Sequence, residues 1–70
     1  MTGEYKAVFD TGTVITSENK HDIYKSIREY FSTQDAFLAV LSYNGTVIAY
    51  VWDTPAGMYV VSAIGEYKVN

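Results

Sequence analysis

Residues 36–52 read AFLAVLSYNGTVIAYVW, two apolar and β-rich runs joined by Asn44-Gly45. An Asn-Gly pair between alternating apolar runs is a strong signal for a β-hairpin, because a type I′ turn needs positive φ at both central residues. If Tyr43 pairs with Thr46 across this turn, a regular ladder predicts three further cross-strand pairs: Leu41 with Ile48, Ala39 with Tyr50, and Phe37 with Trp52. The hairpin therefore has one small aliphatic face and one large aromatic face.

The segment before this hairpin predicts two strands and a helix. Residues 4–9 (EYKAVF) alternate, residues 13–16 (TVIT) are all β-branched, and Asp10-Thr11-Gly12 between them is typical of a turn. The period then changes at Asn19, a good N-cap with Asp22 three residues later. From Lys20 to about Ser32 the apolar residues share one stripe of an amphipathic helix, namely Ile23, Tyr24, Ile27, Tyr30 and Phe31.

The segment after the hairpin predicts one more strand. Pro55 suits the first central position of a type I turn, and Gly57 suits a left-handed position after it, which would pair Thr54 with Met58. Residues 58–64 (MYVVSAI) then form the fifth strand. Gly65 is expected to break or bend it, which leaves residues 66–70 as a short continuation or a frayed tail.

These elements predict a single α+β domain over residues 1–70 in the order ββαβββ. One amphipathic helix packs on one face of a five-stranded, mainly antiparallel sheet. A right-handed crossover through the helix allows two strand orders, 2-1-3-4-5 and 2-1-5-4-3, and the sequence does not choose between them.

The predicted sheet has more apolar surface than one helix covers. The aromatic helix stripe favours a shallow platform of small side chains, which are Leu38, Val40, Val47, Ala49, Val51, Val61 and Ala63. The other face then presents Phe37, Leu41, Tyr43, Ile48, Tyr50, Trp52, Met58, Val60 and Ile64. Three fates are open for this second face. The sheet curls or the N-terminal hairpin and the tail fold over part of it, the face is buried in a symmetric dimer, or it binds another protein.

Composition narrows the class of protein. The chain has 70 residues, a formal net charge of −3 and no cysteine, so disulfides and cysteine-bound zinc are excluded. Lys and Arg are few and dispersed along the sequence, which makes direct nucleic-acid binding unlikely. No signal peptide is predicted, because no N-terminal stretch combines basic residues with an apolar run of about 7–15 residues. No membrane span is predicted either, because the longest apolar runs fall far short of the ~20 residues that cross a bilayer. We expect a cytoplasmic protein.

Catalysis is not expected. The only histidine, His21, lies on the polar side of the predicted helix, and no nucleophile stands beside a base. His21, Asp22 and Glu18 do not have the spacing of a metal site, since adjacent helical residues do not face each other. No glycine-rich phosphate loop occurs, so neither a metal nor a cofactor is predicted.

The predicted function is therefore a small non-catalytic module that blocks or bridges a partner protein through its aromatic sheet face. By compositional analogy it is an inhibitor of the kind encoded by phages or mobile elements. Its expected partner-binding residues are Phe37, Leu41, Tyr43, Ile48, Tyr50, Trp52 and Met58. The alternative is a structural homodimer assembled through the same face. A DNA mimic is a third interpretation, for which eight scattered acidic residues give a low charge density.

Overall fold

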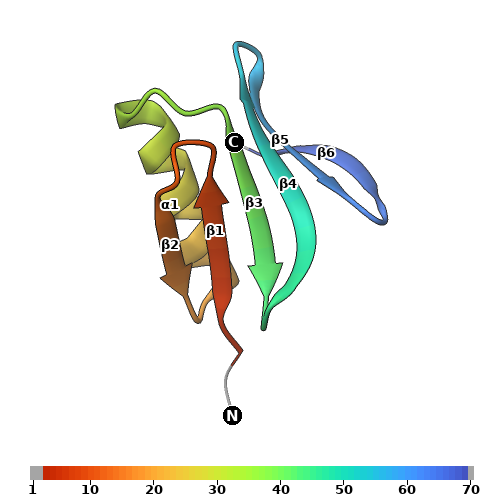
Figure 1. Cartoon of the computed structure of the whole chain (residues 1–70). Coiled ribbons are helices and arrows are strands. Elements are labelled where there is room, and N and C mark those ends of the chain that lie inside the picture. The colour runs from red at the N-terminus through yellow and green to blue at the C-terminus, as the bar shows by residue number, and fades with distance from the viewer. Residues whose placement is uncertain (1–2, 70) are drawn as a thin grey trace.

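The computed structural model describes residues 3–69 and places one helix against one side of a six-stranded antiparallel sheet (Figure 1). The sheet order is β2-β1-β3-β4-β5-β6, which confirms the α+β class and, for the first five strands, the order 2-1-3-4-5. The elements are β1 (Tyr5–Phe9), β2 (Val14–Ser17), α1 (Lys20–Thr33), β3 (Leu38–Tyr43), β4 (Thr46–Thr54), β5 (Gly57–Ser62) and β6 (Gly65–Val69).

The sixth strand corrects the prediction of five. Gly65 adopts a φ of 134°, and it pairs with Ser62 across a two-residue turn. The Ser62 hydroxyl donates a hydrogen bond of 3.3 Å to the Gly65 carbonyl oxygen and so helps to close this turn. Gly65 therefore begins a strand instead of ending one, because a backbone without Cβ reverses direction there at little cost.

The central hairpin has the predicted turn but a different register. Asn44 and Gly45 have φ values of 50° and 86°, and Tyr43 pairs with Thr46 as expected. A β-bulge between Leu41 and Ser42 then shifts the ladder by one residue, so that Leu41 pairs with Ala49 instead of Ile48. The cause lies in β1, whose inward side chains Tyr5, Ala7 and Phe9 pair with Tyr43, Leu41 and Ala39. This pairing turns Ala39 and Leu41 toward the helix. The bulge adds one residue to β4, so that this orientation of β3 is compatible with the pairing of Tyr43 and Thr46 at the turn.

The β4–β5 hairpin also differs from the predicted register. Thr54 pairs with Gly57 instead of Met58, which leaves only Pro55 and Ala56 in the loop. The Thr54 hydroxyl donates to the Gly57 carbonyl oxygen at 2.8 Å and accepts from the Ala56 N–H at 3.2 Å, and these bonds stabilise the short loop. As a result Met58 and Val60 face the helix, and Tyr59 and Val61 face away.

Helix α1 begins and packs largely as its sequence predicts. The Asn19 side chain accepts a hydrogen bond from the Asp22 N–H at 3.2 Å, which confirms the N-cap. The helix continues to Thr33, one residue beyond the expected end. Ile23, Ile27 and Phe31 form its buried side.

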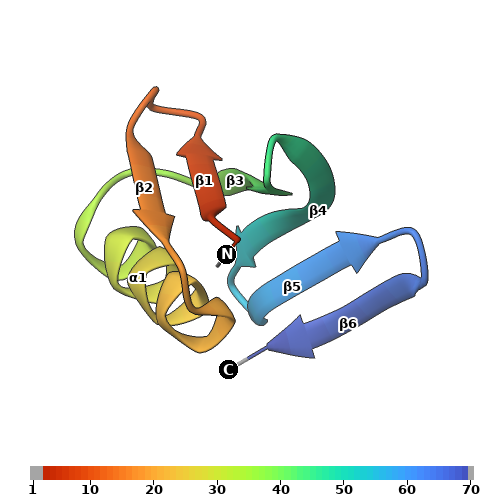
Figure 2. The same ribbon diagram turned by 90° about the horizontal axis from the view of Figure 1, so that it is seen from below.

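The core lies between α1 and the concave side of the sheet. Figure 2 shows the sheet curling so that β5 and β6 approach the helix from the side opposite β2. Phe9 contacts both Tyr30 and Phe31, with ring centroids 4.2 Å and 5.5 Å apart. The buried apolar side chains come from α1, from the loop before β3, and from every strand except β2 and β6. They are Ala7, Phe9, Ile23, Ile27, Phe31, Ala36, Ala39, Leu41, Ala49, Val51, Met58 and Val60.

The placement of the helix corrects two of the predicted sheet faces. Strand β4 has the predicted orientation in its C-terminal half, with Ala49 and Val51 buried and Tyr50 and Trp52 exposed. The bulge in the central hairpin and the two-residue β4–β5 loop each exchange the predicted faces, of β3 and of β5 respectively. Leu38, Val40 and Val61, expected beneath the helix, therefore lie on the opposite face.

Candidate protein-binding face

The convex side of the sheet has no helix over it, and its side chains form rows across the strands. Register partners give one apolar row of Val14, Val8, Val40, Tyr50 and Val61, from β2 to β5. A second row contains Leu38, Trp52 and Tyr59 and ends at Lys68 on β6. We call these two apolar rows, together with Phe37, the open face. At ~4.8 Å between strands, the first row is about 20 Å long.

Phe37 extends the second row just before β3 begins. Its ring stacks on Trp52, with centroids 6.3 Å apart and planes inclined by 24°. The Phe37 backbone is held on both sides, because its N–H donates to Asp10 Oδ1 at 3.2 Å and its carbonyl oxygen accepts from the Asp53 N–H at 2.9 Å. The aromatic pair therefore sits on a fixed backbone.

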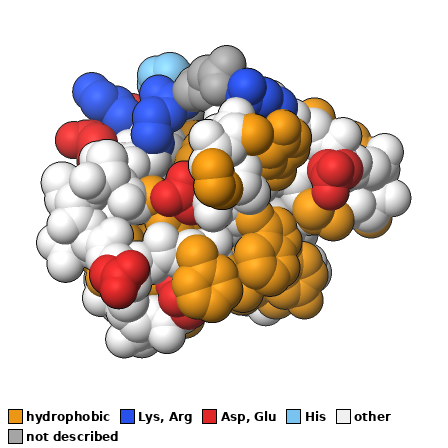
Figure 3. All heavy atoms as spheres, turned by 90° about the horizontal axis from the view of Figure 1, so that it is seen from above, with side chains coloured by type: hydrophobic (Ala, Val, Ile, Leu, Met, Phe, Trp, Pro, Cys, Tyr) orange, Lys and Arg blue, Asp and Glu red, His pale blue; other side chains and the backbone are white. Residues whose placement is uncertain are grey.

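The open face is exposed, and it carries few charges. Phe37, Tyr50 and Trp52 are 57%, 46% and 39% exposed. Among the register positions of this side, the charged residues are Lys6 on β1 and Glu66 and Lys68 on β6. Figure 3 shows hydrophobic side chains gathered on one side of the molecule, with most Lys and Arg side chains on the other side.

The structure brings together three of the seven predicted partner-binding residues, Phe37, Tyr50 and Trp52. Leu41 and Met58 are buried against the helix, because the bulge and the two-residue loop turn them inward, and this removes them from the candidate face. Tyr43 lies at the end of β3 on the helix side, where its ring contacts Tyr5 at a centroid distance of 4.6 Å. Ile48 is exposed at the bulge, outside the two rows, and it lines hollows both with the β5–β6 turn and with Tyr50 and Val61.

Sequence reasoning missed several members of the open face. Val8 and Val14 were predictable, because Ala7 and Phe9 alternate with Val8 and register pairs Val8 with Val14. Leu38, Val40, Tyr59 and Val61 were assigned to the wrong side or left out, since their orientation depends on the two register shifts. The sequence carries no local signal for either shift.

Within residues 3–69, no group of His, Asp and Glu side chains is arranged to hold a metal ion. In the same part of the chain, no helix is both long and apolar enough to cross a membrane. Comparisons of the chain with protein-family models, with curated proteins and with solved structures found no match.

Proposed function

We propose that this protein is a non-catalytic protein-binding module whose open face binds a partner protein and thereby blocks or bridges it. The observation that carries the proposal is the pair of apolar rows of the open face. The first row crosses five strands, and the only charged register positions on this side of the described sheet are Lys6, Glu66 and Lys68. Contiguous exposed apolar surface of this kind marks interaction sites in soluble proteins. Charge depletion with aromatic enrichment is typical of interface cores.

The binding energy is expected to concentrate at Phe37, Tyr50 and Trp52. Large aromatic side chains are the commonest energetic anchors of interfaces, and they lose little conformational entropy on binding. The stacking of Phe37 on Trp52 and the hydrogen bonds of the Phe37 backbone hold the anchors before the partner arrives. Preorganisation of this kind lowers the entropic cost of association.

The shape of the open face favours a concave partner. Because the sheet curls toward α1, its uncovered side is convex (Figure 2). A convex aromatic surface fits a cleft, and occupying a cleft is a direct way to block an enzyme or a receptor. This is the physical support for an inhibitory role.

Self-association through the same face is the second candidate function. Lys6 and Glu66 lie toward opposite edges of the sheet, and a two-fold axis can place each against the other in a second copy. Two convex faces, however, contact each other over a limited area. The curvature therefore favours a different protein over a second copy.

The proposal is tested by measuring whether the affinity for a partner protein depends on residues of the open face. The immobilised protein captures its partner from the cells that produce it, and the purified partner is titrated calorimetrically with wild type and with Trp52→Ala. We expect Trp52→Ala to weaken binding at least ~30-fold, which corresponds to a hot spot of ~2 kcal/mol. Its circular dichroism should match that of the wild type.

Ile64→Ser is the matched control, because Ile64 is 94% exposed in the β5–β6 turn and lies outside the open face. It should retain wild-type affinity. Tyr50→Ala provides a second loss of contact if Trp52→Ala unfolds. Equal binding of the wild type and both aromatic variants would contradict the proposal, and so would the absence of any captured protein whose binding needs these residues.

A further inference from the structure

A groove runs along α1, between the helix and the β5–β6 hairpin, on the side of the sheet opposite the open face. Three adjoining hollows of about 350, 470 and 410 Å³ make up this groove. Arg28 and Val69 line both the first and the second hollow, and Tyr24 lines both the second and the third. The three hollows therefore lie next to one another along the helix.

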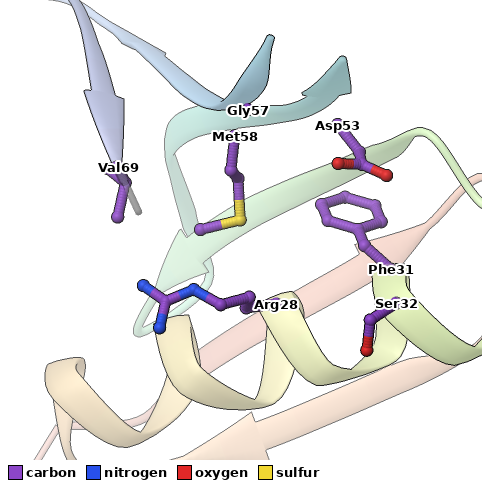
Figure 4. Close-up of a pocket in the computed structure, with 7 residues that line it drawn as sticks. All are labelled: Arg28, Phe31, Ser32, Asp53, Gly57, Met58 and Val69. Carbon is purple, nitrogen blue, oxygen red and sulfur yellow. The ribbon is translucent and has the colours of Figure 1, made fainter. Parts of the chain in front are cut away.

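The floor of the groove is apolar. Phe31 and Met58 form it near the helix C-terminus, and Val69 of β6 lies beside them (Figure 4). Tyr24 and Tyr67 continue it toward the helix N-terminus, where their hydroxyls share a hydrogen bond. An apolar floor of this length offers binding energy to apolar side chains of a ligand.

One wall of the groove is basic, although the chain as a whole carries a net charge of −3. Lys20, Lys25 and Arg28 are three of the chain's five Lys and Arg residues, and all three line the hollows together with His21. At ~100° per residue these four side chains fall within about 140° of the helix circumference, and Asp22 and Glu29 project outside that arc. The helix thus separates its cations from its carboxylates.

The groove has a single carboxylate among its described lining residues. This is Asp53, which lies at the end near Phe31 and Ser32 (Figure 4). Apart from Ser62, the other two hollows are lined by cationic, aromatic and aliphatic side chains, together with His21. An anionic ligand is therefore complementary to most of the groove.

We propose that this groove binds an extended acidic segment of another protein, in which Asp or Glu alternates with large apolar residues. In an extended chain, alternate side chains point in opposite directions, so one set reaches the apolar floor and the other remains near the lysines. A helix of 14 residues is about 21 Å long, which matches about six residues of extended chain. The apolar floor favours such a peptide over a nucleic acid, because a peptide supplies large apolar side chains whereas a nucleic acid presents mainly phosphates and sugars to a groove.

The probe is a fluorescein-labelled hexapeptide of alternating Glu and Leu, mixed with the full chain and followed by fluorescence anisotropy. Three comparison probes are a Lys-Leu hexapeptide, a Glu-Ser hexapeptide and a single-stranded DNA hexamer. We expect the Glu-Leu peptide alone to bind, with an affinity that falls as salt is raised. Amide NMR shifts should appear at residues that line the groove and not on the open face.

Two double variants with the same change of charge locate the site. Lys20→Gln with Lys25→Gln removes two cations from the groove, and Lys6→Gln with Lys68→Gln removes two from the other side of the sheet. All four lysines are exposed, so both variants should fold. We expect the first pair to weaken binding about tenfold and the second to leave it unchanged. Equal losses, preferential binding of the DNA hexamer, or no binding of the Glu-Leu peptide would overturn the proposal.

Discussion

Tyr24 of helix α1 forms a hydrogen bond with Tyr67 of strand β6, and ionisation of the Tyr24 phenol is expected to make the stability of the protein depend on pH. Partial burial, followed by the hydrogen bond with Tyr67, raises the pKa of Tyr24 above the ordinary value of 10.0. The folded protein therefore holds this proton more tightly than the unfolded chain does. The sign follows from linkage: the associated stability is fully present below pH 10 and is lost as pH rises above it.

Replacing Tyr24 by Phe should flatten this alkaline loss. In urea titrations at about pH 9 and about pH 11, the free energy of unfolding of Tyr24→Phe should fall less than that of the wild type. A third titration at neutral pH measures the loss of the Tyr67 hydrogen bond itself. If the two proteins lose equal stability between the alkaline pH values, the assigned role of Tyr24 is wrong.

At the scale of elements, strand β3 is oriented by its neighbour β1 more strongly than by the turn that follows it. The pairing of Ala7 with Leu41 and of Phe9 with Ala39 sets the inward face, and one bulge in the central hairpin absorbs the conflict with the Asn44-Gly45 turn. A one-residue shift reverses every side chain of a strand. The bulge is therefore the feature that decides which residues of β3 lie on the open face.

The two leucines of β3 test this orientation directly, because Leu41 is fully buried and Leu38 lies on the open face. We expect Leu41→Ala to lower the free energy of unfolding by ~2–5 kcal/mol, as for other buried leucines. Leu38→Ala should cost clearly less. Urea denaturation measures the free energy of unfolding of both variants. A larger decrease for Leu38→Ala than for Leu41→Ala would support the regular register and contradict the bulge.

The identity and order of most elements were predictable because their signals are local. The Asn44-Gly45 turn, the Asn19 cap and the alternation of β1 each act within a few residues. The orientation of β3 and β5 was not, since it follows from pairing with β1 and from the Thr54 hydroxyl that closes the loop. Strand β6 was missed because the positive φ of Gly65 supports a turn as readily as it ends a strand.

The candidate site was predictable to the same degree. Tyr50 and Trp52 lie on the predicted side of the sheet, because both register shifts lie outside the C-terminal half of β4. Leu41 and Met58 were assigned wrongly because the shifts reverse the two strands beside it. Of the residues predicted for this face, the aromatic residues Phe37, Tyr50 and Trp52 lie on it, whereas Leu41 and Met58 are buried on the helix side.

At the scale of the whole molecule, the sheet separates two different surfaces. The convex side is apolar and nearly free of charge, whereas the concave side holds the helix and a groove with a basic wall. A protein with both surfaces can contact two partners, or two parts of one partner, at once. Two separate surfaces are therefore as compatible with the proposed bridging of two proteins as with the proposed blocking of one.

A binding role for the open face requires that this face is uncovered in the free protein. The fluorescence of Trp52 measures this directly, because it is the only tryptophan in the chain. Across a dilution series from millimolar to micromolar, we predict a solvent-exposed emission that acrylamide quenches and that does not change with concentration. A blue-shifted emission that persists at micromolar concentration would contradict the account by showing that the chain covers its own face, and a blue shift only at high concentration would show that a second copy does.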